Sequence, residues 1–173
     1  MRRFTPIILL LAVLSISLCS CEREDDVMEI FTGKTWKMSY IFPDGQPSTP
    51  IDFWEGLEDP EEAYKASNEL AKDKSNYNLL FKGGLLNTGK MGGTFEGRAV
   101  NATVEGYWTA DGDTRALQFS DVKWKGTDTD VLAKAFIRGL SANVYKYAGD
   151  NSNLYIHFKD GQLTRVIALV PKK

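Results

Sequence analysis

Alternation of apolar and polar residues is the feature that most restricts how this chain can fold. In TWKMSYIF, the side chains of Trp36, Met38, Tyr40 and Phe42 are separated by single residues, so they would share one face of a strand. The same period of two recurs at residues 77–81, 95–99, 102–108, 117–119, 154–158 and 163–170. So many short, half-buried strands predict a mostly β protein.

Turn residues between these segments favour antiparallel pairing. Asp111-Gly112 and Asp160-Gly161 each separate two alternating segments, and Asp-Gly supplies the positive φ angles of a two-residue hairpin. In LQFSDVKWKG the apolar parity changes after Phe119, which predicts a β-bulge near Ser120 and Asp121. We therefore expect a mostly β (α+β) fold, an antiparallel meander that curls into a barrel or a strongly bent sheet.

Two segments depart from the alternation and predict helices. The segment DPEEAYKASNELAKD opens with Asp59 as an N-cap and Pro60 at the first helical position, which favours a short helix near 60–73. Residues 128–146 carry an apolar stripe with helical spacing, which predicts a helix packed across one end of the sheet. The stripe consists of Val131, Leu132, Ala135, Phe136, Leu140 and Val144.

The first twenty residues indicate export from the cytoplasm. Arg2 and Arg3 precede FTPIILLLAVLSISL, an apolar stretch that is short for a bilayer span and ends in small residues. Leu18-Cys19-Ser20-Cys21 resembles the lipobox of bacterial lipoproteins, which implies cleavage before Cys21 and acylation of that cysteine. An ordinary secretory signal with an incidental cysteine is the alternative.

Acidic residues follow Cys21 directly. Glu22, Glu24, Asp25 and Asp26 predict a solvated linker, so we divide the chain into a signal peptide (1–20), an acidic lipidated tether (21–31) and a single domain (32–173). The acidic run also resembles the export signal of Bacteroidota lipoproteins. That resemblance implies an outer-membrane protein exposed at the cell surface, and the periplasmic leaflet is the alternative.

Charge and cysteine content narrow the possible partners. Without Arg2 and Arg3, the exported chain has 19 basic and 23 acidic residues, a balance that does not suit a nucleic-acid backbone. Cys19 is lost with the signal and Cys21 is acylated, which leaves no thiol for a disulfide or a metal site. We expect no cofactor, no metal and a monomer.

The segment GGLLNTGKMGG at residues 83–93 comes close to a phosphate-binding loop. Gly84, Gly89 and Lys90 have the required spacing, but Met91 stands where a magnesium-binding hydroxyl is needed. The residues that follow alternate like a strand and lack a capped helix. We therefore predict a connection between two strands and no nucleotide binding.

Residues suited to catalysis are scarce. His157 is the single histidine, on the opposite face of its strand from the apolar set, and no G-x-S-x-G segment provides a serine nucleophile. The acidic residues cluster in the tether, at helix starts and in turns, where capping explains them. The sequence predicts no enzyme and no catalytic residues.

Phe53 and Trp54 are the candidate ligand-binding residues. They lie in the longest unpatterned segment, residues 43–60, and an aromatic pair in a loop can stack on a sugar or a peptide. In the alternative, both rings fold back to fill the open end of the barrel.

Four segments follow one another along the chain: GKTWKM, EGYWTADGDTRALQF, AFIRGLSANVYKY and NLYIHFKDGQL. In this order they resemble the META domain, a small β-rich fold of heat-shock-associated envelope lipoproteins. The family's Gly-Cys-Asn segment and later cysteine are missing, so a Bacteroidota relative of unknown function or another lipocalin-like barrel fits as well. The resemblance implies an envelope role, with no catalytic residues to transfer.

These observations predict a non-enzymatic, lipid-anchored envelope protein with a role in envelope stress or maintenance. One alternative is a surface lipoprotein that binds a glycan or peptide through Phe53, Trp54 and additionally Trp108 or Trp124. Another is an inhibitor or assembly factor that binds a protein.

Overall fold

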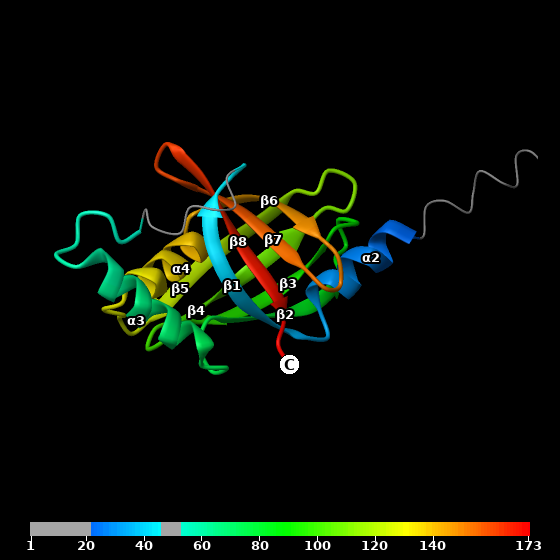
Figure 1. The fold of residues 1–173 in the computed structure, drawn as a ribbon. Helices are drawn as coiled ribbons and strands as arrows, with labels where there is room; N and C mark the ends of the chain where they lie inside the picture. The colour runs from blue at the N-terminus through cyan, green and yellow to red at the C-terminus, as the bar shows by residue number, and fades with distance from the viewer. Residues whose placement is uncertain (1–21, 46–52) are drawn as a thin grey trace, which may run out of the picture.

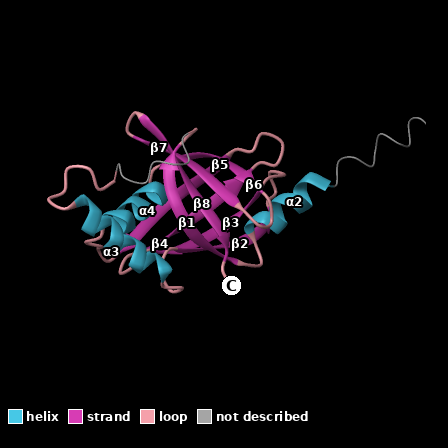
Figure 2. Ribbon diagram, viewed as in Figure 1, coloured by secondary structure: helices cyan, strands magenta, loops and turns pink. Residues whose placement is uncertain are grey.

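The computed structural model describes residues 22–45 and 53–173. Within these residues, eight strands form one antiparallel sheet, and three helices pack at its two ends (Figure 1 and Figure 2). The strands are β1 (Thr35–Pro43), β2 (Asn78–Leu85), β3 (Met91–Arg98), β4 (Thr103–Ala110), β5 (Leu117–Lys125), β6 (Asn143–Gly149), β7 (Leu154–Asp160) and β8 (Leu163–Pro171). The helices are α2 (Glu22–Phe31), α3 (Pro60–Lys72) and α4 (Val131–Ser141). The predicted mostly β fold is confirmed.

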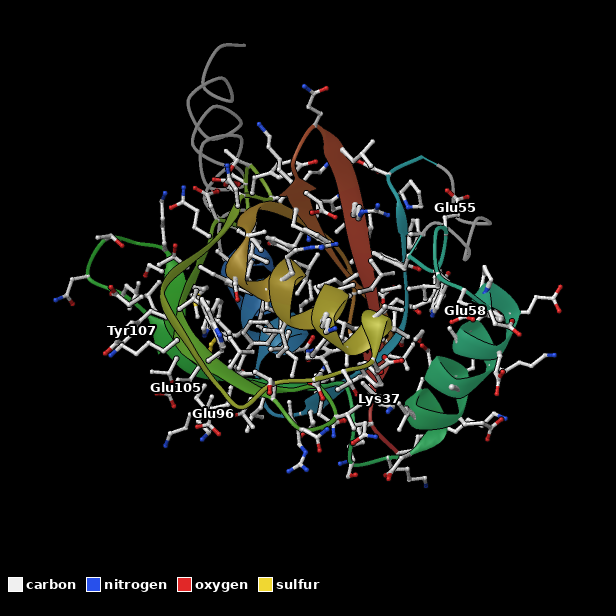
Figure 3. The ribbon with its side chains drawn as sticks, turned by 90° about the vertical axis from the view of Figure 1, so that its left-hand side faces the viewer. Lys37, Glu55, Glu58, Glu96, Glu105 and Tyr107 are labelled. Carbon is white, nitrogen blue, oxygen red and sulfur yellow. The ribbon has the colours of Figure 1, made fainter. Side chains whose placement is uncertain are left out.

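The sheet is strongly bent but not closed. Its strand order is β5-β4-β3-β2-β1-β8-β7-β6, so β5 and β6 are its edges. These edges meet at one end through a bridge between Ala116 and Lys146 and a bond from the Tyr147 amide to the Arg115 carbonyl, 3.0 Å long. Elsewhere α4 lies across the opening (Figure 3).

Three register shifts interrupt the sheet, in β1, β5 and β6, and the first two set which side chains discussed below face inward. The bulge predicted near Ser120 and Asp121 is confirmed, because the pairing of β4 with β5 shifts there and Asp121 has a φ of 50°. A second bulge follows Met38 in β1. It places Ile41 inside and leaves Tyr40 46% exposed, so the prediction that Tyr40 shares the buried face of Met38 is wrong.

The connections between strands follow the turn chemistry in part. A two-residue hairpin follows β7 as predicted, but its turn residues are Gly161 and Gln162, because Asp160 pairs with Leu163. Asp111-Gly112 instead begins a six-residue loop, since Ala110 pairs with Leu117 and the Asp111 carboxylate accepts bonds from two amides within the loop. Residues 83–93 contain the predicted connection between strands: β2 ends at Leu85, residues 86–90 form the loop, and Met91 begins β3.

Two helices match the sequence with one correction. Asp59 caps α3 by accepting a 2.9 Å bond from the Glu62 amide, as its position predicted. Asp130 caps α4 in the same way, but that helix ends at Ser141 and does not reach residue 146. Residues 143–149 form β6 because a strand there pairs with β7 and buries Val144 and Tyr147.

The acidic segment after residue 21 is a helix, which corrects the prediction of a solvated linker. In α2, Val27, Ile30 and Phe31 are buried, at the spacing of one helical face. The Phe31 ring enters one end of the bent sheet and stacks on Trp108, with 4.8 Å between ring centroids. The domain therefore begins before residue 32.

Aromatic rings fill the space inside the sheet. Nine large aromatic side chains among the described residues are almost completely buried: Trp36, Trp108, Tyr77, Tyr147, Phe31, Phe81, Phe95, Phe136 and Phe158. Such packing contrasts with lipocalin barrels, which keep room for a small ligand. The grooves described next lie outside this core.

Candidate functional site

Trp124 near the end of edge strand β5 is the most exposed large aromatic side chain among the described residues. It pairs with Val104 of β4, and directly opposed residues point to the same side of a sheet. Val104 is buried, so Trp124 also projects toward the inner side. At the sheet edge that side opens to solvent next to α4, and Trp124 is 63% exposed.

The bulge at Asp121 produces this orientation. Leu117 is buried on the inner side, and in an unbroken strand the side chain of residue 124 would point outward. The extra residue at the bulge turns the side chains of Val122 and Trp124 to the inner side of the sheet. Val122 packs against the core there. A positive φ at a residue other than glycine is uncommon, and Asp121 adopts one here.

A groove of about 360 Å³, here called the Trp124 groove, lies between this ring and the outer face of α4. Ile137 lines it with Trp124 and gives the groove an apolar wall. Polar groups at its margin include the Lys134 ammonium and the Thr127 hydroxyl, whose side chains make no hydrogen bond within the described residues. The Trp124 groove therefore presents a flat aromatic ring beside hydrogen-bond donors that are available to a ligand.

Other polar groups around the Trp124 groove are already occupied. The Asp128 carboxylate accepts bonds from the amides of Asn101 (2.7 Å) and Ala102 (3.1 Å), which fixes the turn between β3 and β4. Arg138 donates to Asp160 at 3.0 Å. These contacts hold the rim in place and leave Trp124 and Lys134 to contact a ligand.

A second, wider groove of about 670 Å³ crosses the outer face of β2 to β5. Charged side chains of both signs line it, and Trp124 belongs to its lining as well. Glu96 and Glu105 stand opposite each other on neighbouring strands, near Tyr107 (Figure 3). Lys82 pairs with Glu96 at 2.6 Å. This outer groove and the Trp124 groove meet at the edge of β5.

A buried polar network joins the loop after residue 52 to α3 and α4. The Trp54 indole donates to the Ser67 hydroxyl (3.0 Å), and that hydroxyl donates to the Asp130 carboxylate. Tyr77 donates to the same carboxylate at 3.0 Å, and Asp130 also accepts from the Ala133 amide at 2.8 Å. Burial and the adjacent Asp130 charge raise the pKa of Tyr77 far above its ordinary value. The network uses its polar atoms in holding the fold together.

The predicted ligand-binding pair belongs to this packed end of the molecule. Trp54 is 3% exposed, and its ring meets Tyr64 edge-on at 5.1 Å. Phe53 is partly buried, with the Arg165 guanidinium 4.5 Å from its ring centroid. Both rings therefore fold back as in the packing alternative, and ligand contact through the exposed part of Phe53 stays a prediction.

Other candidate residues are distributed as follows. His157 lies on the outer face, as predicted, with Nδ1 3.4 Å from an Asp44 carboxylate oxygen. Trp108 is buried and donates to the Lys82 carbonyl at 3.1 Å. Cys21 and the predicted signal peptide lie outside the described residues. Within residues 22–45 and 53–173 there is no cluster of three potential metal ligands, and no helix has the length and apolar character needed to cross a bilayer.

Comparison with known proteins gives a family and a fold. A family model described as a domain of unknown function (DUF4847) matches residues 22–171. The crystal structure of a DUF4847 family protein from Bacteroides vulgatus is similar, with a TM-score of 0.57 and 24% sequence identity. The match covers 85% of this chain and 99% of that one. No curated protein matches.

Proposed function

This chain belongs to the DUF4847 family, a family defined without a function, and on that premise we propose that it is a lipid-anchored envelope protein that binds a glycan without catalysis. The observation that carries the proposal is the exposed ring of Trp124 at the edge of two grooves. Since aromatic rings fill the core, the proposed binding takes place on the outside.

The chemistry of the Trp124 groove favours a sugar ring over a flat apolar ligand. A sugar presents C–H groups on one face and hydroxyls around its rim, so it can stack on an indole and bond to groups beside it. The groove offers Trp124 and Ile137 for the first purpose, and Lys134 and Thr127 for the second. Its volume of about 360 Å³ is at the small end of ligand sites. The wider outer groove would hold further units of a chain.

Lipid anchoring is proposed from the sequence around Cys21. The family match begins at residue 22, one residue after the cysteine, which supports a processed chain that starts at Cys21. Ten helical residues of α2 would place the lipid about 15 Å from Phe31. We propose the outer leaflet of the outer membrane because of the acidic residues after Cys21, with a role in envelope stress or maintenance as in the META resemblance.

Glycan binding is tested with Trp124→Ala. The full-length chain in detergent is screened against envelope polysaccharides by calorimetry, with Tyr107→Ala as a matched control because Tyr107 is also exposed (54%) but lies in neither groove. We expect Trp124→Ala to weaken binding about fivefold or more, since aromatic stacking contributes roughly 1–3 kcal/mol, and Tyr107→Ala to leave it unchanged. If the chain bound only peptides, or bound no polysaccharide, the proposal of glycan binding would be rejected.

Anchoring and the absence of catalysis have separate tests. Cys21→Ala should abolish incorporation of labelled fatty acid, and protease added to intact cells should remove the domain. Cleavage only after cell breakage would indicate that the domain lies on the periplasmic side.

A hydrolytic activity that disappears in His157→Ala would overturn the non-enzymatic proposal.

A further inference from the structure

A separate groove of about 630 Å³ lies where β1 and β8 meet the loop after α3. Three parts of the chain bring four lysines to its lining. Lys37 comes from β1, Lys74 from the loop after α3, and Lys172 and Lys173 follow β8. We call this hollow the lysine groove.

Lys37 is held in a fixed position inside the lysine groove. Its ammonium donates to the carbonyls of Asp73 (2.7 Å) and Asn76 (2.6 Å) and lies 5.5 Å from the Tyr77 ring centroid. Burial lowers the pKa of Lys37, the Asp73 charge opposes this change, and the positive charge of Lys172 adds to it. Lys37 and Lys172 are therefore close enough to repel each other.

The other three lysines have no neutralising partner. Within the described part of the chain, the ammonium groups of Lys74, Lys172 and Lys173 form no ion pair and no hydrogen bond. No acidic side chain belongs to the groove lining, and the nearby Asp73 carboxylate accepts hydrogen bonds from Ser75. The chain as a whole has a net charge of −2. The outer groove differs in this respect, because Glu96 and Glu105 lie among its basic residues.

We propose that the lysine groove binds phosphate groups. A phosphate monoester carries a charge of about −1.5 to −2 and offers three acceptor oxygens, so it can satisfy several ammonium groups at once. Ser152 and Asn153, from the loop between β6 and β7, add a hydroxyl and an amide donor to the lining. Lysine is an established phosphate ligand because its charge is compact.

The position of the lysine groove allows two sources of phosphate. Its β6–β7 loop is tied to α2 and to the residues after it, since the Asn151 side-chain amide donates to Glu29 at 2.8 Å and Lys34 donates to the Asn151 carbonyl at 3.2 Å. If Cys21 is lipidated, this loop would hold one wall of the groove beside the anchored helix, and phospholipid headgroups are one proposed source. A soluble phosphate compound is the other source, and it requires no anchor.

The test compares two triple variants of the full-length chain. Lys74→Gln, Lys172→Gln and Lys173→Gln together remove three groove charges, while Lys37 is kept because it bonds to two backbone carbonyls. The control replaces Lys65, Lys146 and Lys159 with Gln, since these exposed lysines lie outside the groove. Titration with inorganic pyrophosphate in low salt should show binding about tenfold weaker or more in the groove variant, and nearly unchanged in the control.

Vesicles distinguish the two sources. Variants that also carry Cys21→Ser are mixed with vesicles of phosphatidylcholine, with and without phosphatidylglycerol. If only the groove variant loses binding of pyrophosphate, the ligand is a soluble phosphate compound. If it loses only binding to vesicles with phosphatidylglycerol, the ligand is a lipid headgroup. Either result supports the proposal. Equal weakening in both triple variants, or no binding of any probe by the unmodified chain, overturns it. Trp124→Ala should leave phosphate binding unchanged. The glycan proposal and the phosphate proposal can therefore fail independently of each other.

Discussion

The two ends of the bent sheet are closed by different kinds of contact. At the α2 end, Phe31 lies among three rings, with centroids 4.9 Å from Phe81, 4.8 Å from Trp108 and 5.0 Å from Tyr147. At the α4 end, the carboxylate of Asp130 receives bonds from side chains of different elements. The α2 end is sealed by apolar burial, and the α4 end adds a polar network to the buried apolar face of α4.

This difference predicts different sensitivities. Burial of rings depends on fit, so the ring packing at the α2 end should respond to lost volume and be insensitive to pH. The network depends on protonation and on complete pairing, because a buried polar atom without a partner is costly. Substitutions at each end can therefore confirm or break the comparison.

Phe31→Ala should have the largest effect. Phe31 has no exposed surface, and removing a buried phenylalanine ring costs about 3–5 kcal/mol of unfolding free energy, measurable by urea denaturation. Glu29→Gln on the same helix is the control, since it keeps the acceptor for Asn151 and should change stability by less than about 0.5 kcal/mol. Equal, small effects of both would show that α2 is only a tether.

Asp130→Ala should have the second largest effect and lower the free energy of unfolding by about 3 kcal/mol. The change removes the N-cap of α4 and leaves the Ser67 and Tyr77 hydroxyls without their acceptor. Asp130→Asn is the matched variant, because it keeps an acceptor oxygen and the cap, and should lose less. If thermal and urea unfolding gave the same loss for both variants, the network would contribute little beyond the cap.

Tyr77→Phe should change how stability depends on pH at the α4 end. Because burial raises the folded-state pKa of Tyr77, the hydroxyl stays protonated in the fold, while the unfolded chain ionises near pH 10. Its contribution is complete below that pH and is lost as pH rises above it, by up to about 1.4 kcal/mol per unit. The variant should lose about 1 kcal/mol at pH 7 and show a shallower decline above pH 10. An unchanged alkaline slope would contradict this assignment.

Much of the fold followed from local patterns, and the exceptions have local causes. The alternating strands, the two capped helices and the β5 bulge were predictable because each depends on neighbouring residues. The α2 helix was missed because its buried stripe of Val27, Ile30 and Phe31 is adjacent to a dense acidic run. Strand β6 was missed because Val144 also fits a helical stripe, and pairing with distant β7 decides the outcome.

The candidate sites were less predictable than the fold. Trp124 was recognised as an aromatic residue, but its exposure depends on β5 being a sheet edge beside α4, which no local pattern reveals. Trp54 can be buried because Ser67, thirteen positions away, accepts a hydrogen bond from its indole N–H. The lysine groove joins Lys37, Lys74 and Lys172, residues that are far apart in sequence. A signal was present only in the concentration of lysines at the end of the chain.

The smallest effects are expected from two exposed turn carboxylates, one at each end. Asp111 lies in the loop near α2, where the Thr114 amide and hydroxyl lower its pKa, with help from the Asp113 amide. Asp73 follows α3, where the Ser75 amide and hydroxyl lower its pKa. Because both folded pKa values lie below those of the unfolded chain, each contribution is present above about pH 4 and is lost as pH falls.

Asp111→Asn and Asp73→Asn should therefore each lower the melting temperature slightly at pH 7, by less than Tyr77→Phe, and should have no effect at pH 2. The two variants should behave alike, since each carboxylate accepts hydrogen bonds mainly from an amide and a hydroxyl of its own turn. A clearly larger loss for one of them would show that its loop helps to seal that end of the sheet. Similar small losses would instead confine the difference between the two ends to the buried contacts of Phe31 and Asp130.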